Sequence, residues 1–380
     1  MTLGPSPVDL SPAAGVALLG ALVAMLPLVI VALRLRGGTV GRGRAWQRAL
    51  TLATLFLTID LVTFGAFTRL TDSGLGCPDW PGCYGSTSPV GAHHEITQAQ
   101  AAAPTGPVTH GKAWIEMIHR YLATGVGALI AALMALAWWQ RAQRGSAAVV
   151  VSPWWPTATF VWVCAQGLFG ALTVTLKLYP LVVSAHLLGG LLGVALLSAQ
   201  ARALGDFGVV GGQPTGGQAQ ALRRAAAVVL LVWFAQASLG AWVSTNGAVL
   251  ACSTFPTCQG QWWPAMDWAQ GMTLLHGLGQ DGQGGHITLA ALTAIHMAHR
   301  LGATFAALAL ICLIHEAVRV GGPARLDARV LSGLLLWQWL TGLSNVVLGW
   351  PLVAALGHTL GAALAVAWLT RMVVSARQVS

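Results

Sequence analysis

The sequence has few charged side chains. Of its 380 residues, only 8% are Asp, Glu, Lys or Arg, whereas 56% are hydrophobic. An ordinary soluble domain has roughly 25% charged residues. Because a water-soluble protein of this length cannot cover its surface with so few charges, a soluble fold is excluded and most of the surface must face lipid. The formal net charge is +9, but the basic residues sort by membrane side, so nucleic acid is not an expected partner.

Features of a cleavable signal are also few in the first apolar stretch, and we do not expect it to be one. No basic residue precedes the first apolar stretch, and Arg34 and Arg36 follow it, so we interpret that stretch as a retained membrane span. A membrane-spanning helix needs about 20 mostly apolar residues. The sequence therefore predicts an all-α integral membrane fold. Nine stretches qualify as spans: 13–35, 48–68, 114–140, 153–176, 181–204, 222–244, 290–318, 328–349 and 352–376.

The basic residues in the short connections orient these spans, because Lys and Arg are enriched on the cytoplasmic side. Fifteen of the twenty basic residues fall on one side of the nine spans. We therefore expect the N-terminus outside and the C-terminus in the cytoplasm. The fifteen are Arg34, Arg36, Arg42, Arg44, Arg48, Arg141, Arg144, Arg202, Arg223, Arg224, Arg319, Arg325, Arg329, Arg371 and Arg377.

Two long connections, about residues 69–112 and 245–289, fall on the outer side, and the second contains no Lys or Arg. Connections of this length are usually functional or disordered. Their tryptophans suit a segment that lies on the membrane or, equally, a plain aromatic belt, so the role of residues 260–289 stays open. These tryptophans are Trp80, Trp262, Trp263 and Trp268.

The chain contains an internal repeat, in which spans two to five recur in the same order as spans six to nine. This predicts two pseudo-symmetric four-helix bundles and one extra N-terminal span. The expected units are residues 1–47, 48–205 and 206–380. The matched segments are Gly65-Ala66-Phe67 with Gly240-Ala241-Trp242, Cys77 and Cys83 with Cys252 and Cys258, His119-Arg120 with His299-Arg300, and Ala185-His186-Leu187 with Gly357-His358-Thr359.

Four histidines lie in the first turns of spans that start on the outer side, two in each half. Ionisable side chains inside a span are costly and are therefore functional candidates, although a single one can also be a histidine hydrogen-bonded between helices. Their symmetry favours two facing imidazoles per half, as in a bis-histidine haem site. A metal ion alone is less favoured, because no further ligand completes a tetrahedral set in both halves. The candidate iron ligands are His119, His186, His299 and His358.

The residue one turn before the first histidine differs between the halves. Glu116 precedes His119 by three residues, on the same helix face, and His296 takes that place before His299. This difference predicts that one half performs chemistry on what it binds while the other holds a cofactor. Glu116 would then move protons or stabilise a developing cation. The alternative is a solvated carboxylate at a helix end.

Three outer arginines have two possible partners. Arg120 and Arg300 each follow a candidate ligand, so a haem propionate is one expected partner. A lipid phosphate reached by snorkelling is the other. Arg69, at the end of the second span, has the same two possibilities.

Each outer loop also contains a cysteine pair with five residues between its members. Because the outer compartment is oxidising, the favoured interpretation is one disulfide per loop, Cys77–Cys83 and Cys252–Cys258; the alternative is free thiols.

Other polar residues have no partner in the repeat. Asp60 lies in the middle of the second span and is either part of a proton route or a buried neutral carboxyl group. Cys164 and Cys312 lie within spans and are expected to be small apolar fillers. The remaining histidines are expected to be solvated: His93, His94, His110, His276, His286 and His315.

The outer-loop motifs resemble those of haem A synthases, over about residues 48–376. The resemblance rests on Arg69-Leu70-Thr71-Asp72-Ser73-Gly74-Leu75 running into Cys77-Pro78-Asp79-Trp80-Pro81 and Cys83, on Glu116-x-x-His119-Arg120, on His186, on Cys252 and Phe255-Pro256-Thr257-Cys258, and on His299-Arg300 and His358. The chain departs from the family in its extra first span and in its long Trp-rich loop.

The resemblance implies an oxidoreductase of a bacterial inner (plasma) membrane that oxidises the C8 methyl group of haem O to the formyl group of haem A, in cytochrome oxidase assembly. His299 and His358 would hold a haem b cofactor, and His119 and His186 the haem O substrate. Glu116 matches the family's functional carboxylate. Expected partners are membrane lipid, haem O synthase (protohaem farnesyltransferase) and an electron acceptor, and association with further copies of the chain is an option that stays open.

Two other functions use the same histidines. One is a di-haem b-type cytochrome that transfers electrons from quinol, which needs no Glu116. The other is a non-enzymatic haem carrier or assembly chaperone. The electron acceptor, the source of the oxygen atom and the oligomeric state stay open.

Overall fold

The computed structural model describes residues 11–35, 42–144, 151–205 and 216–374, which form helices joined by loops. Arg36 and Arg377, two members of the predicted cytoplasmic basic set, lie outside the described residues. The helices are α1 (Ser11–Arg34), α2 (Arg42–Leu70), α3 (His93–Ala102), α4 (His110–Arg144), α5 (Trp154–Thr175), α6 (Pro180–Ala203), α7 (Gly217–Thr245), the 3-10 helix η2 (Ala248–Leu250), α8 (Trp268–Gly271), α9 (Leu289–Val320), α10 (Ala324–Val347) and α11 (Leu352–Val373).

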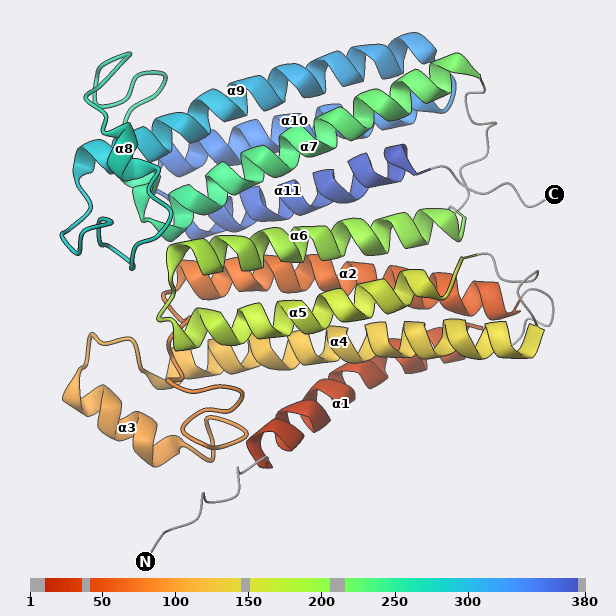
Figure 1. The fold of residues 1–380 in the computed structure, drawn as a ribbon, viewed down its shortest axis with the longest axis horizontal. Helices are drawn as coiled ribbons and strands as arrows, with labels where there is room; N and C mark the ends of the chain where they lie inside the picture. Colours follow the sequence, from red (N-terminus) through yellow and green to blue (C-terminus); the bar gives the residue numbers. More distant parts are fainter. Residues whose placement is uncertain (1–10, 36–41, 145–150, 206–215, 375–380) are drawn as a thin grey trace, which may run out of the picture.

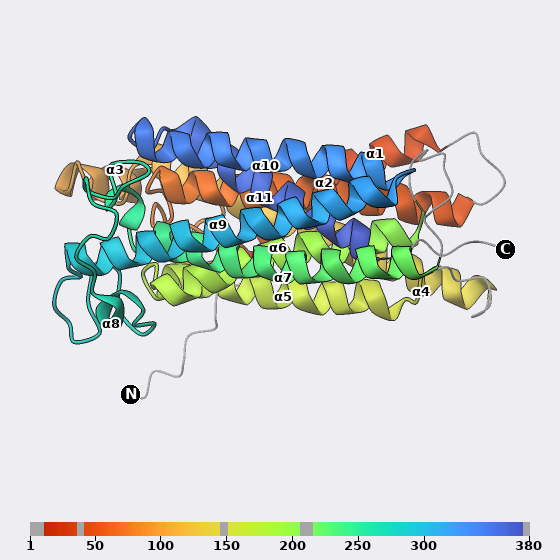
Figure 2. The same cartoon turned by 90° about the horizontal axis from the view of Figure 1, so that it is seen from above.

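The all-α membrane fold is confirmed. Within the described ranges, nine helices are long and apolar enough to cross a membrane, one for each predicted span. The largest boundary differences are at helix starts: α2 begins at Arg42, six residues before the predicted position, and α7 at Gly217, five residues before it. The sequence analysis missed α3 and α8, two short helices inside the long outer loops. Both views of the fold place α3 and α8 at the same end of the long helices (Figures 1 and 2).

The long helices pack as two groups. In the first, α4 contacts α2 and α5, and α6 contacts the same two helices; in the second, α9 and α11 each contact α7 and α10. Helices α2 and α6 meet α11, and α6 also meets α7, so these three contacts join the groups. Figure 1 shows α7, α9, α10 and α11 on one side of α6, with α2, α5, α4 and α1 on the other. The pseudo-symmetric relation and the division into units stay predictions.

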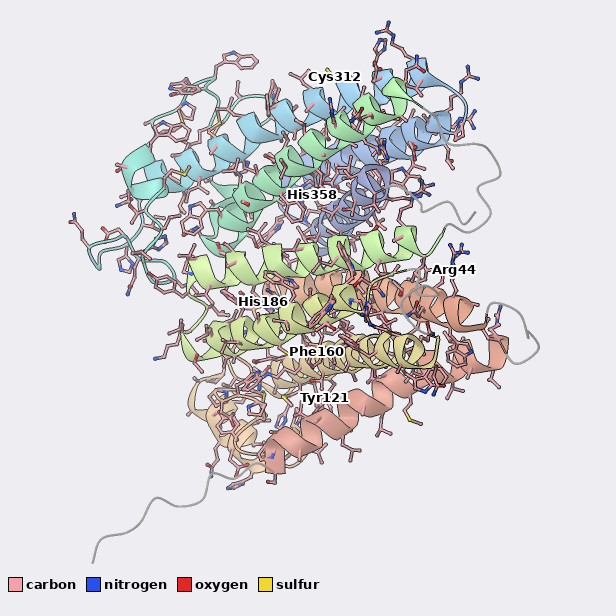
Figure 3. The ribbon with its side chains drawn as sticks, turned by 45° about the vertical axis from the view of Figure 1, so that its right-hand side comes forward. Arg44, Tyr121, Phe160, His186, Cys312 and His358 are labelled. Atoms are coloured by element: carbon pink, nitrogen blue, oxygen red, sulfur yellow. A yellow bond between two sulfur atoms is a disulfide. The ribbon has the colours of Figure 1, made fainter. Side chains whose placement is uncertain are left out.

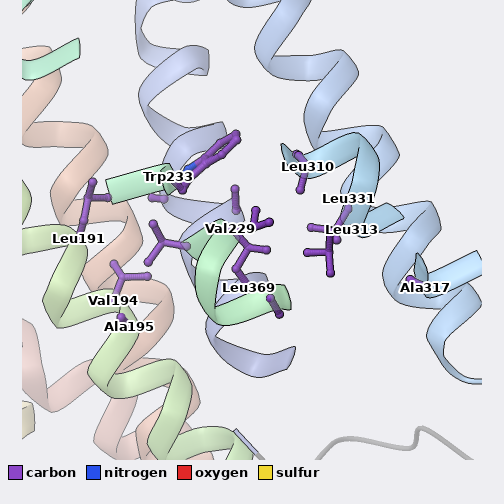
Figure 4. Packing of buried hydrophobic residues seen from close by; sticks show 14 of the residues in the cluster. Leu191, Val194, Ala195, Val229, Trp233, Leu310, Leu313, Ala317, Leu331 and Leu369 are labelled. Carbon is purple, nitrogen blue, oxygen red and sulfur yellow. The ribbon is translucent and has the colours of Figure 1, made fainter. Parts of the chain in front are cut away.

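Buried side chains from both groups fill the space between them, with Leu191 and Val194 of α6 facing Val229 and Trp233 of α7 and Leu369 of α11 (Figure 4). Lipid tails are as apolar as these side chains, so helix association in a membrane rests on close packing and hydrogen bonds rather than on transfer from water. Small residues permit that packing. Those with no exposed surface in this cluster are Ala226, Ala317, Ala363 and Ala365.

Helix α1 packs on α4 outside the first group. The two helices cross where Gly20 meets Gly125: a Cβ added at Gly20 would lie 3.0 Å from the backbone nitrogen of Gly125. Such small-residue crossings bring two backbones together without bulky side chains between them. The predicted extra span is therefore an added helix on the flank of the four-helix group.

Four threonine hydroxyl groups of α2 are satisfied within the helix. In α2, Thr51, Thr54, Thr58 and Thr63 each donate a hydrogen bond to the carbonyl oxygen four residues earlier, at 2.7–2.9 Å. An unsatisfied hydroxyl in hydrocarbon would be costly. This local pairing explains why a helix rich in threonine is compatible with the membrane.

Candidate active site

The two candidate ligands of the first half face each other across the helix group. His119 lies in α4 and His186 in α6; Figure 3 labels the latter. Both helices contact α2 and α5, and among the described residues α4 and α6 make no direct contact, so the two histidines lie on diagonally opposite helices of the group. Each ring lies deep among the helices and keeps a partly exposed edge.

The second half repeats this arrangement. His299 lies in α9 and His358 in α11. In the described part of the chain, α9 and α11 also lack a direct helix–helix contact. Figure 3 shows His358 in one group of helices and His186 in the other. The structure thus brings the four predicted residues together as two pairs, one per half.

A glycine on the neighbouring helix faces each histidine of the first half. A Cβ atom added at Gly65 of α2 would lie 3.1 Å from Nε2 of His119, and one added at Gly170 of α5 would lie 3.5 Å from Cε1 of His186. The first distance is tighter than an ordinary van der Waals contact, so a side chain at Gly65 would displace the ring. The two glycines leave space around the imidazoles.

The second half has the same feature. A Cβ atom at Gly240 of α7 would lie 3.1 Å from Cε1 of His299, and one at Gly342 of α10 would lie 3.2 Å from Cε1 of His358. A pair of imidazoles with glycines beside both rings fits a flat porphyrin whose iron takes two axial nitrogen ligands. The residues present therefore fit haem in both halves.

The rings of the second half have hydrogen-bond partners on adjacent helices. Gln236 of α7 places its Nε2 2.9 Å from Nδ1 of His299 and 3.1 Å from the carbonyl oxygen of the same residue. The hydroxyl of Thr341 of α10 lies 3.1 Å from Nδ1 of His358. Thr341 also lines an apolar cavity of about 500 Å³ between α2, α10 and α11.

The rings of the first half lack such partners. Nδ1 of His186 is buried and, within the described residues, has no hydrogen-bond partner. No hydrogen bond to the ring of His119 occurs in the described ranges either. The two halves therefore share their iron-facing geometry and differ in what surrounds the rings.

Glu116 joins α4 to the first outer loop. Its Oε2 accepts a hydrogen bond of 2.8 Å from the backbone N–H of Cys77, and its Oε1 pairs with the guanidinium of Arg120. Both side chains are buried. Arg120 donates further hydrogen bonds to the carbonyl oxygens of Asp79, at 2.9 Å, and Pro81, at 3.2 Å. A buried ion pair with these additional partners fixes the loop against the start of the span.

Arg300 holds the second loop without a carboxylate. It donates to the carbonyl oxygens of Cys252 and Thr254, at 3.2 and 2.9 Å, and to that of Thr257 at 3.0 Å. Nδ1 of His296, the counterpart of Glu116, lies 2.9 Å from a backbone carbonyl oxygen of η2. Loop carbonyls thus already take several N–H groups of both arginines, and the propionate role stays a prediction.

Both cysteine pairs form disulfides, Cys77–Cys83 and Cys252–Cys258. After each disulfide the chain makes the same short turn, in which the second cysteine exchanges two backbone hydrogen bonds with the residue three positions on, Ser86 or Gln261. The internal repeat therefore extends to the backbone of the loops.

Several other expectations need revision. His276 was expected to be solvated, but its ring is buried and packs edge-on against Trp242 at 5.5 Å. Cys164 and Cys312, expected as fillers, are exposed on the outer faces of their helices. Asp60 is also exposed, so it is not a buried carboxyl group.

Arg69 has a partner that the sequence did not suggest. Its Nη2 donates a hydrogen bond of 2.7 Å to the carbonyl oxygen of Ser244 at the end of α7. The outer ends of α2 and α7, one from each half, are thereby joined.

Four residues of the site were missed by the sequence analysis: Gly170, Gly342, Gln236 and Thr341. A signal for the glycines was present, because Gly170 and Gly342 are separated by 172 residues, the same offset as His186 and His358. Gln236 and Thr341 break the repeat, so no internal comparison could have indicated them.

Comparison with known proteins identifies the family of the chain. Residues 48–370 match the profile of the cytochrome oxidase assembly protein family. The chain belongs to this family. It is 37% identical over 311 residues to the heme A synthase of Shewanella oneidensis, covering 82% of this chain and 91% of that protein. It is 27% identical to the heme A synthase of Rhizorhabdus wittichii, over 84% of this chain and 90% of the relative, and 25% identical to that of Halalkalibacterium halodurans, over 82% and 90%.

Proposed function

We propose that this protein is a haem A synthase, a membrane oxidoreductase that converts the C8 methyl group of haem O into the formyl group of haem A. Family membership and relatives of that name support the proposal. The observation that carries it is the pair of facing histidines in each half, with a glycine beside every ring. One pair serves a substrate and the other a cofactor.

In this proposal, His299 and His358 hold a haem b cofactor and His119 and His186 hold haem O. Haem b, when bound, supplies an electron-transfer centre. The protein orients the substrate by fixing its iron between α4 and α6, and the space beside Gly65 and the partly exposed ring edges accommodate the porphyrin. Because haem O has a long apolar tail, it enters sideways from lipid.

Glu116 is the proposed catalytic residue. Its carboxylate lies one turn from His119 towards the outer loop and has His296, not a carboxylate, as its counterpart. Oxidation of a methyl group releases protons, and a carboxylate beside the substrate can accept them or stabilise a developing positive charge. The hydrogen bonds from Cys77 and Arg120 hold the carboxylate in place.

The same proposal includes the membrane, the orientation of the protein and its partners. The protein spans the bacterial inner membrane several times, with the disulfide loops outside and the basic connections in the cytoplasm. Haem O synthase supplies the substrate of this protein, and a separate electron acceptor reoxidises the protein after each reaction. Association with further copies of the chain is compatible with this function.

The test is the haem content of the purified protein, expressed with a supply of haem O. Extraction, chromatography and pyridine haemochrome spectra should find haem A or haem O beside haem B. A protein that carries haem B alone, in both halves and after turnover conditions, would contradict the proposal and favour an electron-transfer cytochrome.

A further inference from the structure

The hydroxyl of Thr341 contacts the ring of His358. It donates a hydrogen bond to the carbonyl oxygen of Trp337 at 2.7 Å, and Nδ1 of His358 lies 3.1 Å from the same oxygen. A hydroxyl that donates to a carbonyl group still has lone pairs that accept the Nδ1 proton of a neutral imidazole. That tautomer leaves the lone pair on Nε2 for the metal, and the contact limits the rotation of the ring.

Gln236 of α7 is the partner of the His299 ring. Its side-chain Nε2 lies 2.9 Å from Nδ1 of His299 and donates a hydrogen bond of 3.1 Å to the carbonyl oxygen of the same residue. One amide group therefore contacts both the ring and the backbone of His299 and limits the rotation of the ring.

The first half has apolar residues in both of these positions. The offset of 175 that relates Gly65 to Gly240 relates Leu61 to Gln236, and the offset of 172 that relates the glycines of α5 and α10 relates Phe169 to Thr341. Neither Leu nor Phe can accept a hydrogen bond from the N–H group of an imidazole. The buried, unpartnered Nδ1 of His186 is the direct consequence.

We propose that Thr341 and Gln236 are positioning residues that retain the cofactor in the second half, and that the first half releases its haem because it lacks them. The inference rests on the proposed function and deepens it. Partners of a ligating histidine typically change metal affinity by about 10- to 100-fold. A cofactor site benefits from such partners, whereas a site that exchanges substrate for product at every turnover does not.

The test compares Thr341→Val and Gln236→Leu with the unaltered chain, purified in detergent with haem B bound. Transfer of haem to an excess of apomyoglobin gives the rate of loss from each half. We expect the double variant to lose second-half haem about 10- to 100-fold faster. The reduction potential of the haem in the second half should rise and its low-spin electron paramagnetic resonance signal should shift, because the histidine ligand becomes less basic. Thr341→Ser keeps the hydroxyl, so the rate of haem loss, the potential and the resonance signal should stay close to those of the unaltered chain.

Two further variants keep the test informative. Thr304→Val is the matched control, because the hydroxyl of Thr304 bonds only to the carbonyl oxygen of Arg300 in its own helix. The reciprocal variant Phe169→Thr supplies an acceptor near His186 and should slow haem loss from the first half. It needs no disruption of the second half, so it tests the inference even where the double variant fails to fold.

The outcomes separate this inference from the proposed function. If haem loss, potential and resonance signal are unchanged in the double variant while His299→Ala abolishes second-half binding, the positioning role is wrong and the haem site stands. If the unaltered chain binds no haem, or His299→Ala and His358→Ala leave bound haem untouched, the proposed function itself fails.

Discussion

In the first half of the molecule, a buried Glu116–Arg120 pair ties the outer loop to α4, whereas in the second half Arg300 holds the corresponding loop and His296 stands where the glutamate would be. Around the histidines the second half has the more polar residues: it supplies hydrogen-bond partners to both rings, whereas the first half has apolar residues in those positions. The first half therefore has a carboxylate beside its loop arginine, and the second half has hydrogen-bond partners at its histidine rings.

This difference in polar groups indicates which parts of the repeat belong to haem binding in both halves and which belong to the role of one half alone. The histidines, the facing glycines and the disulfide loops occur in both halves and suit any bis-histidine site. In the proposed function, the residues that differ between the halves separate retention of a cofactor from reaction of a substrate. Changing them one half at a time should therefore give unequal results, and equal results would contradict the comparison.

The largest difference should come from the histidines. Replacing His299 and His358 by Ala should remove the resident haem from the purified protein and abolish conversion of haem O. Replacing His119 and His186 should also abolish conversion but leave the resident haem in place. Absorbance of the Soret band per protein, with haem extraction, measures both effects. Equal haem loss from the two double variants would show that the halves do not divide the roles.

Replacement of Glu116 should have the next largest effect. Glu116→Gln keeps an acceptor for the Cys77 N–H group but loses the charge, so conversion should fall by about 100-fold or more, as for loss of a proton-transfer group, with bound haem unchanged. His296→Gln in the other half is the control and should reduce conversion far less.

Glu116→Ala separates chemistry from folding. It leaves the buried guanidinium of Arg120 without its carboxylate, and breaking a buried pair costs about 3–5 kcal/mol. Thermal unfolding should therefore shift in the Ala variant more than in the Gln variant. Undiminished haem A production by both variants, with haem bound, would remove Glu116 from the mechanism.

A smaller effect is expected at the glycines. Gly342→Ala places a methyl group 3.2 Å from Cε1 of His358, so the ring must shift by a few tenths of an ångström. Overpacking of this kind costs about 1–3 kcal/mol, which should appear as weaker haem retention in the second half alone. Gly333→Ala in the same helix is the control, because nothing lies within 4 Å of the added atom. Equal haem retention by the two variants would contradict a role for Gly342 in ring placement.

Much of this architecture was predictable because both of its signals are periodic. Apolar stretches gave the nine spans, and the repeat paired His119 with His299 and His186 with His358 before any coordinates were known. The short helices α3 and α8 were missed because they lie in loops whose Gly and Pro content obscures a weak helical pattern.

The partners of the site were not predictable for a different reason. The hydrogen bond of Arg69 to Ser244 and the burial of His276 against Trp242 join residues far apart in the sequence, and nothing in the local pattern marks either one. For Arg120 and Arg300 the sequence indicated a need for anionic or acceptor partners, but only the folded loop shows that backbone carbonyl oxygens fill part of it.

The smallest expected effect concerns the two disulfides. Each closes a short loop, with a sequence separation of 6, so its chain-entropy contribution is about 2 kcal/mol. In both halves an arginine also binds the loop carbonyls and should keep the loop near its place without the covalent bond. We expect Cys252→Ser with Cys258→Ser to lower the thermal unfolding temperature by a few degrees and to change conversion by less than about threefold.

In the first half, the N–H group of Cys77 also orients Glu116, so Cys77→Ser with Cys83→Ser should cost more activity for a similar loss of stability. Activity and unfolding temperature measured on both double variants decide the point: the same loss of conversion in each half would mean that the first loop has no special part in holding the carboxylate, and the difference between the halves would then be confined to the helices.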